Sequence, residues 1–186
     1  MRIISGLLKG KSLNYIKNLN TRPLKDIVKE SIFNVLKHSN HINIDIENSN
    51  VIDLYSGVGS FGIECISRGA NKVIFIEQDI GATNILNKNL KKLNILHKAT
   101  VKNDKIENVF KKENFKQFDI LFLDPPFKDK KFTEILKVIK EKHICNKKHV
   151  VIIHREKKVE DYLKDSIDIV LAKNYGRSKI IFGTFN

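Results

Sequence analysis

The sequence predicts an α/β fold built on a mostly parallel β-sheet with helices on both faces. The first observation is that, beyond about residue 49, short apolar runs alternate with segments of helical periodicity. The second is that runs such as Val51–Leu54 and Asp119–Leu123 are almost continuously apolar, which is typical of strands buried on both faces. The third is that the last two candidate strands have no helix between them, so we expect the sheet to end in a β-hairpin.

A small N-terminal extension is expected over residues 1–48, ahead of a core domain at residues 49–186. Within the extension, Arg2–Ser5 and Lys11–Leu13 can pair as a hairpin around two glycines. Thr21 stands where an N-cap would, and a proline follows two residues later. Apolar residues then recur at helical spacing, at Leu24, Ile27, Val28, Ile32, Val35 and Leu36. The polar stretch 38–49 is expected to be the loop that leads into the core.

The core then alternates strands and helices. Besides the two strands named above, we expect strands at Lys72–Ile76, Thr100–Lys102, Val150–Ile153, Ile167–Leu171 and Lys179–Phe185. We expect helices at Ser60–Arg68, Ile80–Leu93, Lys105–Lys112, Phe132–Glu141 and Val159–Leu163. The link Ala172–Ser178 contains Gly176 and suits a tight turn, which would make the last of the seven strands antiparallel.

Composition narrows the class of partner. The formal net charge is +13, and a basic surface attracts phosphate groups, which favours a nucleic acid. The alternative is a solvated lysine-rich surface that reflects a general bias toward Lys, Asn and Ile. No apolar run is long enough to span a membrane, and the first residues lack the apolar stretch of a secretory signal. Cys65 and Cys145 have neither a metal-ligand nor a C-x-x-C spacing, so we expect reduced thiols in a cytoplasmic compartment.

A glycine-rich loop follows the first core strand. Gly57, Gly59 and Gly62 fit the pattern G-x-G-x-x-G between a strand and a helix, where the backbone can approach a nucleotide-like ligand closely. Glu77 lies twenty residues after Gly57, at the end of the second strand, and its carboxylate can accept hydrogen bonds from ribose hydroxyls. The pattern therefore predicts a cofactor that contains a nucleoside, although a structural tight turn remains the alternative.

Two acidic residues bear on which cofactor it is. Asp53 stands four residues before Gly57, and a carboxylate there suits the cationic amino or sulfonium side of S-adenosylmethionine better than a pyrophosphate. Asp104 follows the third strand and either binds an adenine amino group or caps the next helix.

The most specific motif is Asp124-Pro125-Pro126-Phe127, directly after the fourth strand. Two consecutive prolines restrict the backbone and supply no N–H, so they make a stiff turn. In such a turn, the Asp124 carboxylate and the Pro125 carbonyl can accept the two N–H groups of an exocyclic base amine. Phe127 offers a flat face on which the base can stack. Because methyl transfer is an in-line displacement, this positioning carries much of the catalysis.

Together these features resemble class I methyltransferases, whose fold is Rossmann-like. The Asp-Pro-Pro-Phe form is similar to the amino-methylating branch, and adenine-N6 DNA methyltransferases share it. More narrowly, the chain resembles the RsmD family of bacterial 16S rRNA guanine-966 N2-methyltransferases almost throughout. The residues that carry this resemblance are Met1-Arg2-Ile3-Ile4-Ser5-Gly6 with Lys9-Gly10, Thr21-Arg22-Pro23, Ser67-Arg68-Gly69-Ala70 and Tyr175-Gly176-Arg177. Tyr55-Ser56 stands where the family more often has Phe-Ala.

The resemblance implies S-adenosylmethionine as cofactor and a cytoplasmic, monomeric enzyme without a metal. The implied substrate is 16S rRNA within the small ribosomal subunit or its assembly intermediate. Candidate cofactor contacts are Asp53, Tyr55, Ser56, Gly57, Gly59, Glu77 and Asp104, and the catalytic group is Asp124, Pro125, Pro126 and Phe127. Candidate rRNA contacts are Arg2, Arg22, Lys25, Tyr175 and Arg177, since arginine can bridge phosphates; each of them also has a plausible structural role.

Three other interpretations remain open from sequence. The chain could be an adenine-N6 DNA methyltransferase, although only about fifty residues precede the first core strand, which is short for a target-recognition region. It could be an NAD-dependent oxidoreductase, against which Asp53 and the Asp-Pro-Pro-Phe motif argue. It could also be a ribosome-binding protein without activity. His154 and Arg155 are expected to be strand-end residues rather than catalysts.

Overall fold

The computed structural model describes residues 1–15, 24–42 and 44–186, which form one seven-stranded sheet. The strand order is β3-β2-β1-β4-β5-β7-β6, and every pair among the first five strands is parallel. Strand β7 is antiparallel to both of its neighbours, as the hairpin at the end of the sequence predicted. The strands are β1 (Asn50–Leu54), β2 (Lys72–Ile76), β3 (Ala99–Lys102), β4 (Phe118–Leu123), β5 (Cys145–Glu156), β6 (Asp168–Tyr175) and β7 (Ser178–Thr184).

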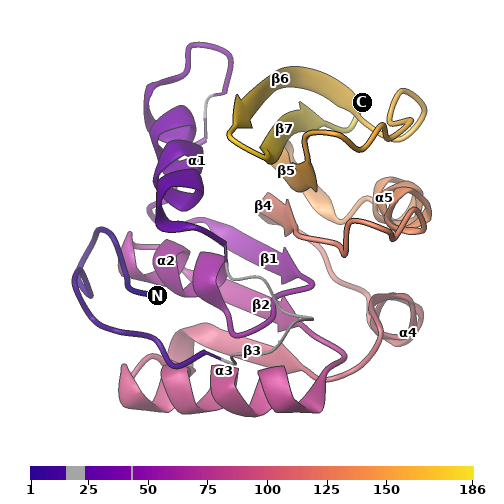
Figure 1. The fold of residues 1–186 in the computed structure, drawn as a ribbon. Helices are drawn as coiled ribbons and strands as arrows, with labels where there is room; N and C mark the ends of the chain where they lie inside the picture. Colours follow the sequence, from indigo (N-terminus) through magenta and orange to yellow (C-terminus); the bar gives the residue numbers. More distant parts are fainter. Residues whose placement is uncertain (16–23, 43) are drawn as a thin grey trace.

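Helices cover both faces of the sheet. Figure 1 shows α1, α2 and α3 on one face and α4 and α5 on the other. Their bounds are α1 (Asp26–His38), α2 (Ser60–Ser67), α3 (Ile80–Lys92), α4 (Ile106–Lys112) and α5 (Phe132–Glu141), with a 3-10 turn at Leu96–Lys98. None of the helices in the described ranges is long and apolar enough to cross a membrane.

Each central strand contributes side chains to two separate cores. In β4, Ile120 and Phe122 lie in the core beneath α1, α2 and α3, whereas Leu121 and Leu123 lie in the core beneath α4 and α5. This alternation follows from the two-residue period of a strand, and it explains why β4 is continuously apolar from Ile120 to Leu123.

The predicted helix at Val159–Leu163 is wrong. This segment is an irregular link between β5 and β6. Its shape is set by tertiary bonds: the Asp161 carboxylate binds the guanidinium of Arg155, and the Lys179 ammonium donates to the carbonyl of Val159 at 3.0 Å. Apolar residues four apart resemble a helical stripe, but here these contacts outweigh the local propensity.

The N-terminal hairpin is reduced to one antiparallel bridge, between Arg2 and Ser12. Two backbone bonds support it, from the N–H of Ile3 to the carbonyl of Lys11 (3.0 Å) and from the N–H of Gly10 to the carbonyl of Ile3 (2.9 Å). The boundary at residue 48 stays a prediction, but the extension shares a core with the rest of the chain. Among its buried members are Ile3, Leu13, Leu24, Val28 and Ile32.

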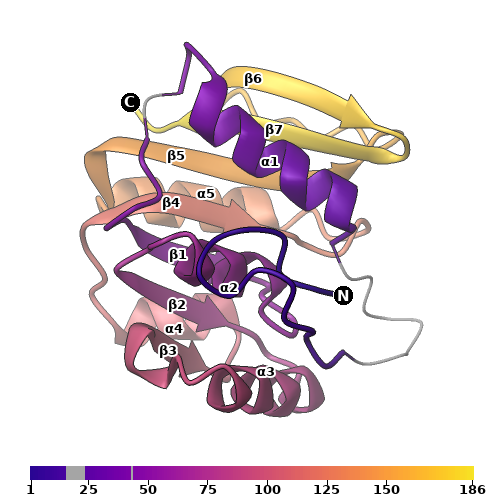
Figure 2. The same cartoon turned by 90° about the vertical axis from the view of Figure 1, so that its left-hand side faces the viewer.

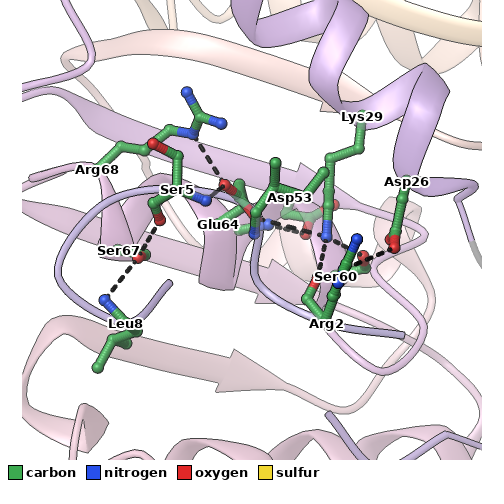
Figure 3. Close-up of polar contacts among 12 residues, drawn as sticks. Arg2, Ser5, Leu8, Asp26, Lys29, Asp53, Ser60, Glu64, Ser67 and Arg68 are labelled. Atoms are coloured by element: carbon green, nitrogen blue, oxygen red, sulfur yellow. Dashed lines mark hydrogen bonds and ion pairs between the residues drawn. The ribbon is translucent and has the colours of Figure 1, made fainter. Parts of the chain in front are cut away.

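A buried ion pair anchors this extension to α2. Figure 3 shows Lys29 from α1 and Arg68 from the end of α2 converging on Glu64. The side chains of Lys29 and Glu64 have no exposed surface, and the ammonium lies 3.4 Å from the carboxylate. Glu64 also accepts two backbone N–H groups of the N-terminal segment, at 2.8 and 2.9 Å, and the Arg68 guanidinium at 2.9 Å. These bonds offset the cost of burying the charges.

Candidate active site

The candidate site lies at the carboxyl ends of β1 and β4, in the middle of the sheet. The chain leaves β1 toward α2 on one face, and after β4 it continues to α5 on the other face (Figure 1). The backbone N–H of Asp124 contacts the carbonyl of Leu54 at 3.4 Å, so the segments that follow the two strands are neighbours. In an open α/β sheet, such a divergence creates the crevice in which ligands bind.

The glycine loop has the backbone shape that its sequence predicted. Gly57 and Gly59 adopt φ angles of 55° and 85°, in the left-handed region that favours glycine. Gly59 is the N-cap of α2, and its N–H bonds to the carbonyl of Ser56 at 2.8 Å. A Cβ atom on Gly62 would lie 2.3 Å from the ring of Phe75, so this third glycine lets α2 pack closely on the sheet.

Asp53 lies beneath the glycine loop instead of lining an open crevice. Its residue is only 1% exposed, and its Oδ2 accepts the N–H of Gly62 at 2.9 Å. Burial raises the pKa of this carboxyl group well above its usual range. The structure therefore gives Asp53 a supporting contact with the start of α2, and its expected contact with a cationic group stays a prediction.

Glu77 reaches the loop from the end of β2. Its Oε2 accepts the N–H of Gly57 at 2.8 Å, and its Oε1 accepts the N–H of Asp79 at 2.8 Å. The backbone carbonyl of Glu77 is bound by the amide of Asn103 at 2.9 Å. The carboxylate is thus held beside the loop, at the place where a ribose was expected, and each oxygen retains a second lone pair.

Ser56 has a buried hydroxyl that lacks a partner. Among the buried side-chain nitrogen and oxygen atoms of the described residues, its Oγ is the one without a hydrogen bond. An unsatisfied buried polar group costs about 1–3 kcal/mol. A ligand that bonds to this hydroxyl would remove the cost, so the loop fits a polar cofactor.

Tyr55 connects the glycine loop with the chain that follows β4. Its hydroxyl donates to Oδ2 of Asp129 at 3.2 Å. Its φ of 57° is unusual for a residue with a side chain and points to a specific constraint. Burial, together with the Asp129 carboxylate, raises the pKa of the Tyr55 phenol, which keeps its proton for this bond.

Asp104 is engaged with α4. Its Oδ1 accepts from the amide of Asn108 and the N–H of Lys105, both at 2.8 Å, and its Oδ2 binds the ammonium of Lys112 at 3.0 Å. These bonds, with that of Asn108 the largest contribution, lower the pKa of the carboxyl group to about 2. These bonds correspond to the alternative in which Asp104 stabilises the start of the next helix, although Lys105 occupies the N-cap position itself.

Asp124 is held by a histidine from the neighbouring strand. His154 Nδ1 lies 2.8 Å from Asp124 Oδ1, and His154 Nε2 lies 2.9 Å from the hydroxyl of Ser178 at the start of β7. Phe127 is half-buried, with its ring edge-on to the imidazole at 6.0 Å between centroids. The Asp124 carboxylate and the Phe127 ring therefore contact the same imidazole, and their joint role in holding a base stays a prediction.

Arg155 contacts the same turn from the inside. It is fully buried, and its guanidinium faces the backbone carbonyls of residues 125–127 and 129. His154 and Arg155 lie at the end of β5, as expected, but their contacts with the turn after β4 were not predicted from the sequence. One sequence signal was present: a histidine and an arginine directly follow the apolar run Val150–Ile153.

Comparison with known proteins identifies the family. A family model described as "Conserved hypothetical protein 95" matches residues 1–184. A Bacillus subtilis protein named "Putative rRNA methyltransferase YlbH" is 34% identical over 176 residues, which cover 93% of this chain and 91% of that protein. "Ribosomal RNA small subunit methyltransferase D" of Haemophilus influenzae is 40% identical over 129 residues, 68% of this chain and 64% of that protein. The chain belongs to the RsmD family.

The fold agrees with this RsmD assignment. A crystal structure described as a "putative methylase" of Haemophilus influenzae matches with a TM-score of 0.77 at 28% identity. The match covers 100% of this chain and 98% of that one. The predicted class I methyltransferase fold is confirmed, including the N-terminal extension within the matched length.

The candidate RNA contacts of this RsmD-family chain differ in exposure. Arg2, Lys25 and Arg177 are exposed, and Arg2 lies 3.7 Å from the carboxylate of Asp26. Tyr175 is half-buried against the core of the extension. Figure 2 shows that the start of α1 and the turn between β6 and β7 lie at the side of the sheet where the parallel strands end. Arg22 lies outside the described residues.

Proposed function

We propose that this RsmD-family chain transfers a methyl group from S-adenosylmethionine to the exocyclic N2 of a guanine in 16S rRNA. The observation that carries the proposal is the corner after β4, where His154 holds one oxygen of Asp124 beside the glycine loop. The names of the relatives support ribosomal RNA of the small subunit as the substrate class. The choice of guanine N2 rests on the family resemblance and on the Asp-Pro-Pro-Phe motif.

The glycine loop would hold the cofactor. Bound S-adenosylmethionine supplies an electrophilic methyl group on a sulfonium. Glu77 would accept from ribose hydroxyls, and Ser56 would gain the partner that its hydroxyl lacks. Gly57 and Gly59 let the backbone approach the ligand. Asp53 would act from beneath by fixing the start of α2.

The turn after β4 would position the base. An exocyclic amine is a poor nucleophile because its lone pair is delocalised into the ring. Oδ2 of Asp124 and the carbonyl of Pro125 would accept its two N–H groups, so that charge developing on nitrogen is stabilised. Phe127 would stack on the base, which a flipped-out nucleotide requires. The proton leaves the nitrogen once the methyl group has been transferred, and Asp124 is placed to accept it.

The exposed basic residues would bind the RNA backbone. Lys25 and Arg177 belong to segments at the side of the sheet where the parallel strands end (Figure 2). The net charge of +13 favours a phosphate-rich partner. We propose that a single copy acts in the cytoplasm on the small ribosomal subunit or its assembly intermediate, with Arg2 and Tyr175 as further contacts.

Transfer of labelled methyl groups to purified small subunits, with duplex DNA as the second substrate, tests this proposal. We expect label in 16S rRNA at guanine N2, as shown by nucleoside analysis. Asp124→Ala should abolish transfer while S-adenosylhomocysteine still binds. Glu141→Ala, which removes an exposed carboxylate at the end of α5, is the matched control and should retain activity. Label in DNA adenine would favour the adenine-N6 enzyme, and cofactor binding without transfer to either substrate would favour a ribosome-binding protein.

A further inference from the structure

We propose that Arg155 is a positioning residue that fixes the Asp-Pro-Pro-Phe turn (residues 124–127) in the shape needed to hold a base. The inference rests on the proposed function, because the turn matters catalytically only if it holds the target amine. Arg155 is fully buried at the end of β5, so it acts through the turn and not by touching substrate.

A buried carboxylate orients the guanidinium. Asp161 accepts from Arg155 Nε at 2.8 Å and from Nη2 at 2.9 Å, and its side chain is 2% exposed. Two parallel bonds of this kind fix the plane of the arginine fork and compensate its charge. The guanidinium carbon lies over the ring of Phe132, 4.6 Å from its centroid, so the ring covers a face of the guanidinium. The irregular link after β5 therefore serves to bring Asp161 to this place.

The remaining N–H groups point at the turn. Nη1 donates to the carbonyls of Pro126 at 3.0 Å and Pro125 at 3.4 Å, and the remaining N–H of Nη2 is shared between those of Phe127 at 3.0 Å and Asp129 at 3.2 Å. One guanidinium thus contacts four carbonyls of a segment whose two prolines supply no N–H of their own. The bond to Pro125 is the longest of the four, so this carbonyl retains capacity to accept a base amine.

The contacts of Arg155 extend through Asp129 to the glycine loop that would hold the cofactor. Asp129, whose carbonyl binds Arg155, accepts the hydroxyl of Tyr55 through its side chain. Tyr55 directly precedes the loop at Ser56 and Gly57. The geometry therefore ties the position of the base-holding turn to the position of the cofactor loop through Arg155, Asp129 and Tyr55.

Arg155→Lys tests the inference because it keeps the charge and removes the fork. We expect kcat on small subunits to fall by about 10²-fold, the effect of a displacement of about 1 Å at a reacting group. KM and the Kd for S-adenosylhomocysteine should stay within about threefold. Hydrogen exchange should accelerate in peptides that cover residues 127–131. Arg68→Lys is the matched control, since Arg68 also pairs with a buried carboxylate and stacks on a ring, that of Phe33; it should lower Tm without a change in kcat.

Several outcomes separate this inference from the proposed function. If Arg155→Lys retains wild-type kcat, or if residues 127–131 exchange no faster, the positioning role is wrong. If kcat falls only as much as in Arg68→Lys, Arg155 is merely structural and the inference is again overturned. If wild-type protein methylates no small subunit but the variant still exchanges faster at residues 127–131, the proposed function is wrong, whereas the conclusion that Arg155 restrains the turn holds. Should Arg155→Lys not fold, Asp161→Asn provides the same readouts, with an expected loss of about tenfold in kcat.

Discussion

The imidazole of His154 in β5 lies next to the residue that follows β4, with Nδ1 2.8 Å from Oδ1 of Asp124. Its other nitrogen meets the hydroxyl of Ser178, in the antiparallel strand β7. The contact engages Oδ1 of Asp124, and in the proposed function Oδ2 is the oxygen that would accept the target amine. The terminal hairpin thus contributes to the site as well as to the sheet.

Loss of the His154 contact should slow methyl transfer more than it weakens binding. We expect His154→Ala to reduce kcat by about tenfold, because a hydrogen bond to a charged group contributes about 1.5–3 kcal/mol. His154→Asn should recover part of the loss if its amide reaches Oδ1. Steady-state kinetics on small subunits and titration with S-adenosylhomocysteine measure the two effects. His97→Ala, at an exposed position, serves as control; equal kcat in His154→Ala and the control would contradict the role.

Ser56→Ala should affect stability and ligand affinity in opposite directions. Its hydroxyl is buried without a partner in the free protein, so its removal should leave Tm unchanged or raise it slightly. If the cofactor supplies the missing bond, the Kd for S-adenosylhomocysteine should rise by roughly two- to tenfold. Thermal shift with and without ligand records both effects. An unchanged Kd would show that the hydroxyl does not contact the cofactor.

Glu64→Gln should destabilise the protein more than Lys29→Met. The first change leaves the Lys29 ammonium buried without its counter-charge, at a cost of about 3–5 kcal/mol. The second leaves Glu64 paired with Arg68 and with two backbone N–H groups. Burial lowers the pKa of Lys29, because an ammonium group removed from water is less stable in its charged form. Urea unfolding gives the two free energies, and the reverse order would refute this account of the anchor.

His149 should make the protein less stable in mild acid. Its Nε2 accepts the N–H of Phe185 at 2.8 Å, so the neutral ring carries its proton on Nδ1, which lies 2.7 Å from the carbonyl of Asn146. Burial lowers the pKa of this histidine, so the folded state binds fewer protons than the unfolded state. The stabilisation is present above the unfolded pKa of about 6.5 and is lost as pH falls below it.

Thermal unfolding at pH 7.5 and 5.5 measures this effect. We expect Tm to fall less between these two values in His149→Gln than in the wild type, because the variant has no ring to protonate. His97→Gln, at an exposed position, should behave as the wild type does. The explanation fails if His149→Gln and wild type lose Tm equally.

The sequence by itself determined the parts of this protein that depend on local backbone chemistry. Gly57 and Gly59 have the positive φ angles that their motif predicted, because glycine adopts them without a steric penalty. The apolar run of β4 placed the strand correctly, since its residues alternate between two cores. Order along the chain was enough to predict the parallel strands and the final hairpin, because connections in such folds are short and right-handed.

Only the tertiary structure decided where the charged side chains point. Asp104 is bonded to a residue of α4, and Asp53 lies beneath the glycine loop. The sequence patterns make both residues candidate cofactor contacts and do not indicate these bonds. Arg155 and Asp161 are six residues apart in the sequence, and the spacing of apolar residues between 159 and 163 predicted a helix there. The irregular link found in its place is what brings the Asp161 carboxylate to Arg155. The physical reason is that a charge is positioned by partners from distant segments, which bury it and satisfy its hydrogen bonds, whereas the backbone of a turn or strand follows from the residues within it.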